Sequence, residues 1–266
     1  MPEIAEIRIM SDFINREVRS RVYYSIRKSF ISKVITPMNL TFEYFTIKSE
    51  CRGKELKLIL TCKATGDKKS LICNMGMSGN WEVTQKDHEP KHMHLMFDSM
   101  DNTILGLVDT RRFAKWRWGD WNYGRGPDPI MDHDNFLNNI WNNIEDKAFE
   151  KPICEILMNQ AYFNGLGNYL RAEVLFRANQ NPFQIAKDAI NDNPAILELC
   201  KIIPIEAYQM GGGQLKDWDN PFELEADTFN EWIKCYGRKD MLSVVDKTGR
   251  KLWFDSKWKS NCIYDF

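Results

Sequence analysis

The spacing of hydrophobic residues changes along the chain, and each change predicts a different kind of element. Apolar residues recur every three or four positions in residues 1–19, which predicts an amphipathic helix. Residues 21–125 instead contain short apolar runs separated by turn-forming Gly, Asp and Asn, as in a β-sandwich or barrel. The runs expected to be strands are Leu56–Leu60, Ser70–Cys73, His92–Phe97 and Thr103–Val108.

Helical spacing returns in the second half of the chain and gives way to strands at its end. The predicted helical stretches are residues 136–144, 153–160, 169–177 and 188–231, the last around a loop at 211–213. Residues 241–254 return to the strand pattern and predict a single hairpin that turns at residues 247–249.

The strongest break in the pattern is Gly124–Pro129, which holds two glycines and two prolines and is therefore the expected link between two domains. A length of 266 residues is also near the size at which one core divides into two. The sequence predicts an α+β fold with two domains. Residues 1–125 form a helix and a β-sandwich, 126–134 the linker, 135–234 a helical domain and 235–266 the hairpin.

Composition narrows the class of protein. The chain is 43% hydrophobic and 27% charged, values that exclude a disordered, collagen-like or membrane protein. The acidic start, Met1–Glu6, differs from the basic start of a signal peptide, so an intracellular protein is expected. Seven scattered cysteines are expected to be free thiols, with disulfides or a metal site as the alternative. His92 and His94 would share one face of a strand without a third ligand at suitable spacing, so no metal is predicted.

The net charge of −1 and the pI near 6.5 argue, taken alone, against a nucleic-acid-binding protein. The charge is unevenly distributed, however. Residues 1–60 hold eleven basic and seven acidic residues, a net +4, and residues 234–266 hold eight and four, again +4. Residues 178–231 hold three basic and ten acidic residues, a net −7. Two basic ends suit phosphate binding, and the acidic segment is expected to face away from it.

The chain start carries the first candidate chemistry. If Met1 is removed, Pro2 presents a secondary amine, and an α-amino group has a pKa of about 7.7–8, so part of it is neutral at pH 7. Such an amine could attack a sugar C1′ and form an iminium ion. Glu3, and Glu6 one helical turn on, could donate and accept protons. Taken alone, the same residues are also an ordinary chain start.

Three further segments of the first half are ambiguous one by one. Lys54, on a turn before a strand, could project towards a ligand or into solvent. Met75–Gly79 and Asp109–Phe113 follow strands and could form a wedge that replaces an extruded base, with core packing as the alternative for Met77. Basic and aromatic residues then alternate in Lys115–Trp118, a pattern that favours nucleic acid.

The second half offers a glycine-rich corner and two isolated cations. In residues 160–169 the glycines allow a sharp turn, and Asn168 is expected to cap the next helix, whose free N–H groups could hold a phosphate. An ordinary helix–turn–helix corner is the alternative. Arg250 at the hairpin tip could anchor a phosphate or simply be solvated, and Lys234 is equally ambiguous alone.

Taken in order, these segments resemble the formamidopyrimidine-DNA glycosylase/endonuclease VIII family over essentially the whole chain. The motifs that carry the resemblance are Pro2-Glu3…Glu6, Gly53-Lys54, Gly76-Met77-Ser78-Gly79, Asp109…Arg111-Arg112-Phe113, Gly126-Pro127-Asp128-Pro129 and Asn164-Gly165-Leu166-Gly167-Asn168-Tyr169. Residues 163–173 and 248–254 are most similar to the eukaryotic and viral Nei-like enzymes with a zincless finger, and the absence of C-x-x-C pairs agrees with that branch.

The resemblance implies a bifunctional DNA glycosylase and AP lyase that needs no cofactor. Pro2 would form the Schiff base, Glu3 would protonate the deoxyribose ring oxygen, and Glu6 would support them. The DNA contacts that it implies are Lys54 at the phosphate beside the lesion, Met77, Arg111, Arg112 and Phe113 at the void and the unpaired base, Asn168 and Arg250 at phosphates, and Lys234 at the flipped base. Residues 135–234 would then contain the helix–two-turn–helix motif, and 235–266 the zincless finger.

The chain departs from the family pattern at three places. Ile4-Ala5 stands between the two glutamates where Gly or Leu and then Pro are usual, and Ala114 replaces the Gly that commonly follows Arg-Arg-Phe. Residues 205–231 are also short for the lesion-covering loop of bacterial formamidopyrimidine enzymes. This favours oxidised pyrimidines and hydantoins over 8-oxoguanine, with β- and δ-elimination after excision.

The expected partner is damaged DNA, in duplex form with single-strand activity also open, and the expected state is a monomer without membrane association. The expected location is the nucleus of a eukaryote, or the host-cell or viral replication site of a virus. Two alternatives remain at this point. One is a lesion-binding protein that has lost turnover, and the other is a ribosome-like RNA binder that shares only the helix–two-turn–helix element.

Overall fold

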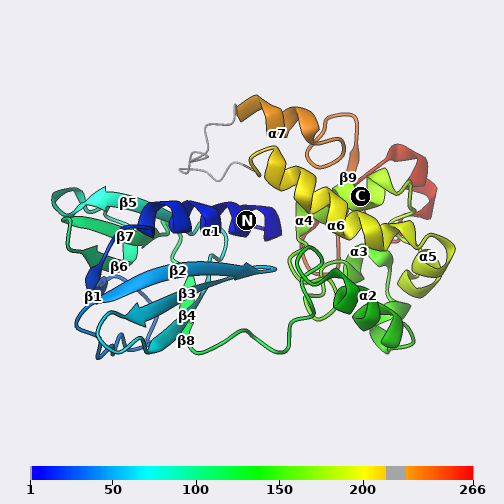
Figure 1. Cartoon of the computed structure of the whole chain (residues 1–266). Coiled ribbons are helices and arrows are strands. Elements are labelled where there is room, and N and C mark those ends of the chain that lie inside the picture. Colours follow the sequence, from blue (N-terminus) through cyan, green and yellow to red (C-terminus); the bar gives the residue numbers. More distant parts are fainter. Residues whose placement is uncertain (1, 214–225, 266) are drawn as a thin grey trace. The chain divides into compact units, whose positions relative to one another are not determined.

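The chain divides into two compact units, which are described separately. The computed structural model describes residues 2–213 and 226–265. The first unit comprises Pro2 and Glu6–Asn122, and the second comprises Glu3–Ala5, Tyr123–Gly213 and the described residues from 226 onwards. The predicted α+β class is confirmed, because a helix and an antiparallel sandwich are followed by helices and a hairpin (Figure 1).

The first unit contains most of α1 (Ile4–Val18), the helix predicted from the three- and four-residue spacing. Its apolar residues Ile7, Met10, Ile14 and Val18 are all buried. On the same helix, Asn15 donates through Nδ2 to the carbonyl of Ser49 at 2.9 Å and accepts the N–H of Ser49 at 2.7 Å. These contacts fix α1 against a strand backbone that would otherwise lack partners.

Eight antiparallel strands form the sandwich of the first unit. They are β1 (Tyr23–Lys28), β2 (Phe45–Arg52), β3 (Glu55–Cys62), β4 (Lys68–Asn74), β5 (Asn80–Gln85), β6 (Met93–Ser99), β7 (Thr103–Val108) and β8 (Lys115–Trp118), with the short helix η1 (Lys86–His88) after β5. The four runs predicted to be strands lie in β3, β4, β6 and β7. The other four strands mix polar and apolar residues and gave no continuous apolar run.

The strand order β5-β7-β6-β1-β2-β3-β4-β8 makes one sheet fold into two layers. β1 pairs with β2 at a single position, Tyr23 with Phe45, whereas the other neighbours pair along most of their lengths. The ring of Tyr23 lies at this single pair. It stacks on Phe45 with 5.9 Å between the ring centroids and meets Phe97 edge-on with 6.5 Å between the centroids. The core of the sandwich therefore begins where the two layers separate.

The alternation of basic and aromatic residues at Lys115–Trp118 has a different cause from the one inferred from sequence. The segment is β8, and successive side chains of a strand point to opposite faces. Trp116 is only 3% exposed, so its ring belongs to the core and does not stack on bases. The nucleic-acid interpretation of this alternation is therefore wrong for Trp116.

The second unit is mainly helical. Its elements are α2 (His133–Asn142), η2 (Lys147–Glu150), α3 (Ile153–Ile156), α4 (Asn168–Arg177), α5 (Ala186–Asp192), α6 (Ala195–Gln209), α7 (Ala226–Trp232), β9 (Leu242–Val245), β10 (Lys251–Phe254) and η3 (Ser256–Asn261). The predicted hairpin is confirmed as β9 and β10, which pair from Leu242–Phe254 to Val245–Lys251. Residues 214–225, in the acidic stretch predicted to be helical, lie outside the described residues.

One hydrophobic core joins the helices and the hairpin of the second unit. α4 packs against α6 and β10, and its Leu170 and Val174 are fully buried beside Leu252 of the hairpin. The first residues of α1, Ile4 and Ala5, belong to the same core. The beginning of the chain is thus packed into the helical unit, close to the start of α4. Within the described ranges, no helix combines the length and the apolar character needed to cross a membrane.

We predict that Asn15→Leu destabilises the fold, because it leaves the N–H and carbonyl of Ser49 without their partner. The expected loss is about 1–3 kcal/mol of unfolding free energy, measured as a lower midpoint of thermal or urea unfolding. Arg16→Ala, on the exposed side of the same helix, is the control and should change the free energy by about 0.5 kcal/mol or less. Equal midpoints for Asn15→Leu and the wild type would contradict this role.

Candidate active site

The carboxylate of Glu3 forms the N-terminal cap of α4. The backbone N–H of Tyr169 donates to Oε1 of Glu3 at 3.0 Å, and the N–H of Leu170 donates to Oε2 at 3.3 Å. Glu3 is 2% exposed. Two backbone donors and the positive end of a helix favour a negative charge at this point. A buried carboxylate from the chain start is therefore held by a helix that begins more than 160 residues later.

Two glycines allow this close approach. A Cβ on Gly167 would lie 2.2 Å from Cδ of Glu3, so any larger residue would displace the carboxylate. Gly165 adopts a positive φ of 103°, and its carbonyl accepts the N–H of Ile4 at 3.0 Å. The glycine-rich turn therefore clasps the start of the chain through both a side chain and a backbone group.

This arrangement corrects the expectation for Asn168. Asn168 is the first residue of α4, and the N-cap position is occupied by Gly167, which has no side chain to cap the helix. The side chain of Asn168 bonds to Lys251 and Arg171 instead. The prediction that the free N–H groups of this helix hold a phosphate is also wrong for Tyr169 and Leu170, because Glu3 accepts from both. The cap comes from a residue that is distant in sequence, which local spacing could not reveal.

The turn before α4 is fixed by polar side chains from its own unit. Gln160 accepts the N–H of Gly165 at 3.0 Å and donates to the carbonyl of Leu166 at 2.9 Å. Asn164 is fully buried and donates to the carbonyl of Gly126 at 2.9 Å. The Gly126–Pro129 motif is therefore bonded to the glycine-rich turn, and both hold the residues around Glu3 in place.

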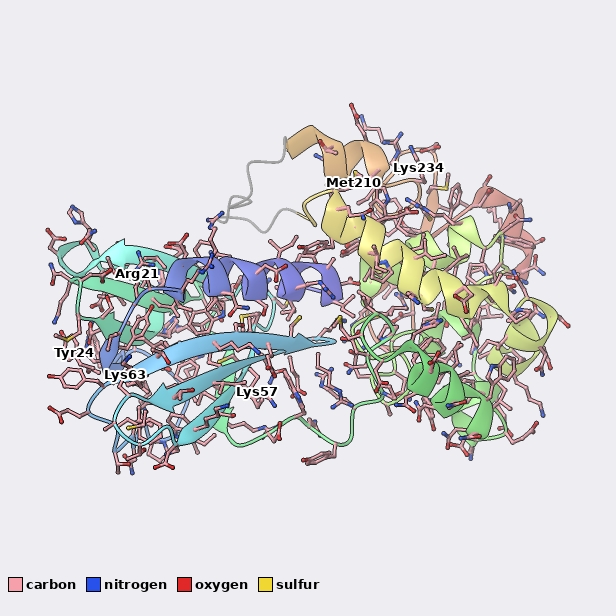
Figure 2. The ribbon with its side chains drawn as sticks, in the orientation of Figure 1. Arg21, Tyr24, Lys57, Lys63, Met210 and Lys234 are labelled. Carbon is pink, nitrogen blue, oxygen red and sulfur yellow. The ribbon has the colours of Figure 1, made fainter. Side chains whose placement is uncertain are left out.

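The other expected catalytic residues lie in the first unit. Pro2 is buried, and Glu6, on α1, is 2% exposed. Lys54 is half-buried on the turn between β2 and β3, where Gly53 has a positive φ of 55°. The neighbouring cation Lys57, labelled in Figure 2, lies on β3 and donates through Nζ to Oδ1 of Asp120 at 2.5 Å, so its charge is paired within the first unit.

A buried aspartate joins the two loops of the first unit that were predicted to enter DNA. Asp109 is fully buried and accepts the N–H groups of Arg111, Phe113 and Ala114. It also accepts the hydroxyl of Ser78, which lies on the other loop, at 2.5 Å. Burial by itself would raise the pKa of Asp109, but the hydroxyl of Ser78 and the backbone N–H groups outweigh it and lower the pKa.

The joined loops expose the residues expected to fill a void in DNA. Met77 is 43% and Phe113 is 47% exposed, and the guanidinium of Arg111 lies 5.1 Å from the centre of the Phe113 ring. Gly76, with a positive φ of 61°, lets the loops touch, because a Cβ there would lie 2.7 Å from the backbone of Phe113. The core-packing alternative for Met77 is therefore excluded, and Arg112, also exposed, adopts a positive φ of 57°.

The structure connects Asn168 and the hairpin bearing Arg250, the two expected phosphate contacts of the second unit. Asn168 donates through Nδ2 to the carbonyl of Lys251, the neighbour of Arg250, at 2.8 Å. Arg250 itself is exposed at the hairpin turn, while Asn168 is half-buried. The helix–two-turn–helix corner and the hairpin tip therefore present their polar residues from one connected structure.

Lys234 is exposed two residues after the end of α7 (Figure 2), and its backbone is held by Glu173 of α4. Glu173 is fully buried and accepts the N–H groups of Lys234, Cys235 and Tyr236 at 2.9–3.0 Å. The Nζ of Lys234 donates to the carbonyl of Glu231 at 2.9 Å. A side chain predicted to touch the flipped base thus projects from a backbone segment fixed by three bonds to one carboxylate.

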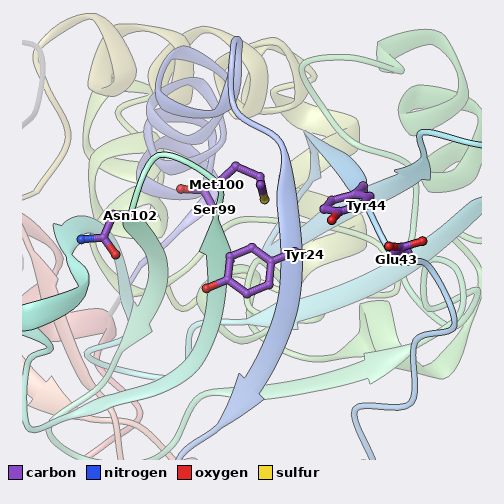
Figure 3. Close-up of a pocket in the computed structure, with 6 residues that line it drawn as sticks. All are labelled: Tyr24, Glu43, Tyr44, Ser99, Met100 and Asn102. Carbon is purple, nitrogen blue, oxygen red and sulfur yellow. The ribbon is translucent and has the colours of Figure 1, made fainter.

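The sandwich also carries a surface pocket of about 460 Å³, which involves other residues (Figure 3). It is lined by Tyr24, Glu43, Tyr44, Ser99, Met100 and Asn102. None of these residues was predicted to belong to the site. All seven cysteines are free thiols, and within residues 2–213 and 226–265 no three His, Cys, Asp or Glu side chains group as metal ligands would.

The residues that sequence reasoning missed are those that hold the site together. The sequence points to Asp109 only as part of a motif, and it assigns no role to Arg171, Glu173 or Asp246. Charged residues that are fully buried look like surface charges in a sequence. Their only signal was position, since Arg171 and Glu173 lie three and five residues after Asn168 in the segment that resembles the family.

Comparisons with known proteins agree with this geometry. The profile of the formamidopyrimidine-DNA glycosylase N-terminal domain matches residues 1–116, and that of the endonuclease VIII-like 1 DNA-binding segment matches residues 227–257. Endonuclease 8-like 1 of Homo sapiens is 35% identical over 96% of this chain and 72% of its own length. The mouse protein of the same name is also 35% identical, with the same coverage.

Solved structures show the same fold. The Lactococcus lactis enzyme in complex with a Fapy-dG-containing DNA superposes with a TM-score of 0.80 at 21% identity, covering 97% of this chain and 99% of that one. The same enzyme with an abasic-site DNA gives a TM-score of 0.79. The chain therefore belongs to the formamidopyrimidine-DNA glycosylase/endonuclease VIII family of DNA glycosylases with AP-lyase activity, and it is a Nei-like member of that family.

Proposed function

We propose that this protein excises oxidised pyrimidines and hydantoins from DNA and then cleaves the strand by β- and δ-elimination. The observation that carries the proposal is the position of Glu3, a buried carboxylate held by the first turn of α4 beside the sequence neighbour Pro2. A fixed carboxylate beside the amine of Pro2 supports an acid–base role for Glu3. The shortness of residues 205–231 supports the choice of lesions, although 214–225 lie outside the described residues.

The first step needs a neutral amine and a group that carries protons beside it. After removal of Met1, part of the Pro2 amine is neutral at pH 7, since an α-amino group has a pKa of about 7.7–8. The nitrogen of Pro2 then attacks C1′ of the damaged nucleotide. The damaged base leaves with the electron pair of its glycosidic bond. The carboxylate of Glu3 takes the N–H proton from the ammonium formed by the attack and passes it to the ring oxygen. The sugar then opens, and the nitrogen lone pair forms the C=N bond of the iminium ion.

The iminium ion formed by Pro2 then drives strand cleavage. It makes the proton on C2′ acidic, and loss of that proton expels the 3′ phosphate. A second elimination expels the 5′ phosphate and leaves a one-nucleotide gap. Hydrolysis of the imine returns Pro2 as a free amine. Glu6 supports this end of the chain, and Lys54 neutralises the phosphate beside the lesion.

The remaining predicted residues hold the DNA in the required conformation. Met77, Arg111 and Phe113 fill the space left by the flipped nucleotide, with Arg112 beside them. Asn168 and Arg250 bind phosphates, and Lys234 contacts the flipped base. We assign residues 1–125 to catalysis, 126–134 to the linker, 135–234 to the helix–two-turn–helix domain and 235–266 to the finger. The enzyme would act as a monomer, on duplex and single-stranded DNA, in the nucleus or at a viral replication site.

A lesion-binding protein without catalytic turnover is the other candidate function. Pro2, Glu3 and Lys54 are all present, and Glu3 approaches Gly167 so closely that no residue larger than glycine fits at 167 without displacing the carboxylate. A binding protein would not need such an approach. An RNA binder that shares only the helix–two-turn–helix element would leave the contacts of Glu3 and Asp109 unexplained.

We predict that Glu3→Gln separates base excision from cleavage at an abasic site. Excision of thymine glycol from duplex DNA should slow by about 10²-fold or more, because the amide cannot deliver a proton to the ring oxygen. Cleavage of a preformed abasic site, whose sugar opens without enzyme, should be affected much less. Single-turnover rates on the two substrates measure this, and a Glu3→Gln enzyme that excises thymine glycol at the wild-type rate would exclude Glu3 as the acid.

We predict that Gly167→Ala impairs excision by moving Glu3, because the new Cβ would occupy the space of the carboxylate. The rate should fall by about 10-fold or more, since proton transfer depends on the position of the acid. Gly66→Ala is the control, because Gly66 also lies on a turn but has nothing within 4 Å of an added Cβ. If both variants excise at the same rate, the contact between Gly167 and Glu3 has no catalytic role.

We predict that Phe113→Ala weakens excision from duplex DNA more than from single-stranded DNA. In a duplex the side chain replaces an extruded base, so its loss raises the cost of flipping by about 1–3 kcal/mol. In a single strand there is no such void to fill. The ratio of kcat/KM on the two substrates should therefore fall by about 10-fold, and an unchanged ratio would argue against the wedge.

A further inference from the structure

A buried ion pair connects α4 with the hairpin. Nη1 of Arg171 lies 2.7 Å from Oδ2 of Asp246, and both side chains are fully buried. Arg171 lies in the first turn of α4, and Asp246 follows β9 directly. Burial of an ion pair removes two charges from water, so such a pair is weak evidence for stability and calls for another explanation.

On the hairpin side, Asp246 organises the turn that carries Arg250. Its Oδ1 accepts the N–H of Thr248 at 2.8 Å, the hydroxyl of Thr248 at 2.6 Å and the N–H of Arg250 at 3.0 Å. Burial alone would raise the pKa of Asp246, but the hydroxyl of Thr248, the N–H of Arg250 and the guanidinium of Arg171 together lower it. The aspartate therefore stays charged and keeps the turn closed.

On the helix side, the same arginine orients Asn168. Nη2 of Arg171 donates to Oδ1 of Asn168 at 2.7 Å, which fixes the amide so that its Nδ2 faces Lys251. Nη1 also donates to the carbonyl of Cys154 at 3.0 Å. Each partner of the ion pair is thus hydrogen-bonded to a proposed phosphate contact. Arg171 bonds to the side chain of Asn168, and Asp246 accepts the backbone N–H of Arg250.

We propose that Arg171 is a positioning residue that sets Asn168 and Arg250 in one fixed geometry for binding two DNA phosphates. The proposal rests on the proposed function. The series Asn168–Arg171–Asp246–Arg250 runs through three consecutive contacts within the second unit. The hairpin turn is held by Asp246, which accepts from Thr248 and Arg250 and pairs with Arg171.

The alternative is that the pair acts only in folding, and two variants separate the two roles. Arg171→Met leaves the charge of Asp246 buried and unpaired, so it should destabilise the protein strongly and could fail to fold. Arg171→Met combined with Asp246→Asn removes both charges. The asparagine keeps the acceptor oxygen for Thr248 and Arg250, so the turn and the fold are retained while the link to Asn168 is cut.

We expect the double variant to unfold near the wild-type temperature and yet to bind DNA less tightly. Its Kd for a duplex with a tetrahydrofuran abasic analogue should rise by about 10- to 100-fold, as expected when bonds to charged groups are lost. The slope of log K against log salt should become shallower by up to about 1, since Arg250 is the cation of the two contacts and each phosphate neutralised by a cation contributes about 0.9. The single-turnover rate of abasic-site cleavage at saturating DNA should change by less than about twofold.

Lys187→Met is the matched control, because it removes one cation from the acidic segment of the same unit and leaves the series intact. It should reproduce the wild-type Kd and salt slope. If the double variant also has the wild-type Kd and slope, Arg171 acts only in folding and the proposal is overturned. If the wild type itself neither binds this duplex nor cleaves an abasic site, the proposed function fails, and the positioning role fails with it.

Discussion

The hydrogen bonds from the first turn of α4 to the carboxylate of Glu3 are the contact on which the proposed site depends. They bind the start of the chain to a helix in the second unit and give a buried charge two oriented backbone N–H groups as partners. Gly167 is required for this contact, and Gly165 holds the adjoining backbone. The proposed catalytic end of the chain is therefore positioned by a turn whose sequence alone predicts only an ordinary helix corner.

α4 is more than the partner of Glu3. Within ten residues it also supplies Arg171, which pairs with the hairpin through Asp246, and Glu173, which holds the backbone at Lys234. One helix therefore positions several proposed functional residues of the second unit: the acid, the two phosphate contacts and the base contact. Asp109 plays a similar part in the first unit, where one buried carboxylate joins the loops of Met77 and Phe113.

Much of the fold could be predicted from the sequence, because periodicity reports burial directly. The first helix, the strands with continuous apolar runs and the final hairpin were all predicted in place. β8 shows the limit of periodicity, since the alternation of Lys115–Trp118 resembles a nucleic-acid pattern although it reflects a strand with one buried face. The exposed residues of the candidate site lie in family motifs, which is why the sequence can point to them. Asp109, Arg171, Glu173 and Asp246 act through contacts with residues distant in sequence, and a buried charge cannot be told from a solvated one by its neighbours.

The central claim is that Pro2 reacts while Glu3, fixed by α4, transfers protons beside it. The most direct test is to reduce the complex with abasic-site DNA by borohydride, digest it and map the modified residue by mass spectrometry. The account predicts that the sugar is attached to the α-nitrogen of Pro2 in protein from which Met1 has been removed. Attachment to a lysine side chain, such as Lys54, with Pro2 unmodified would contradict it.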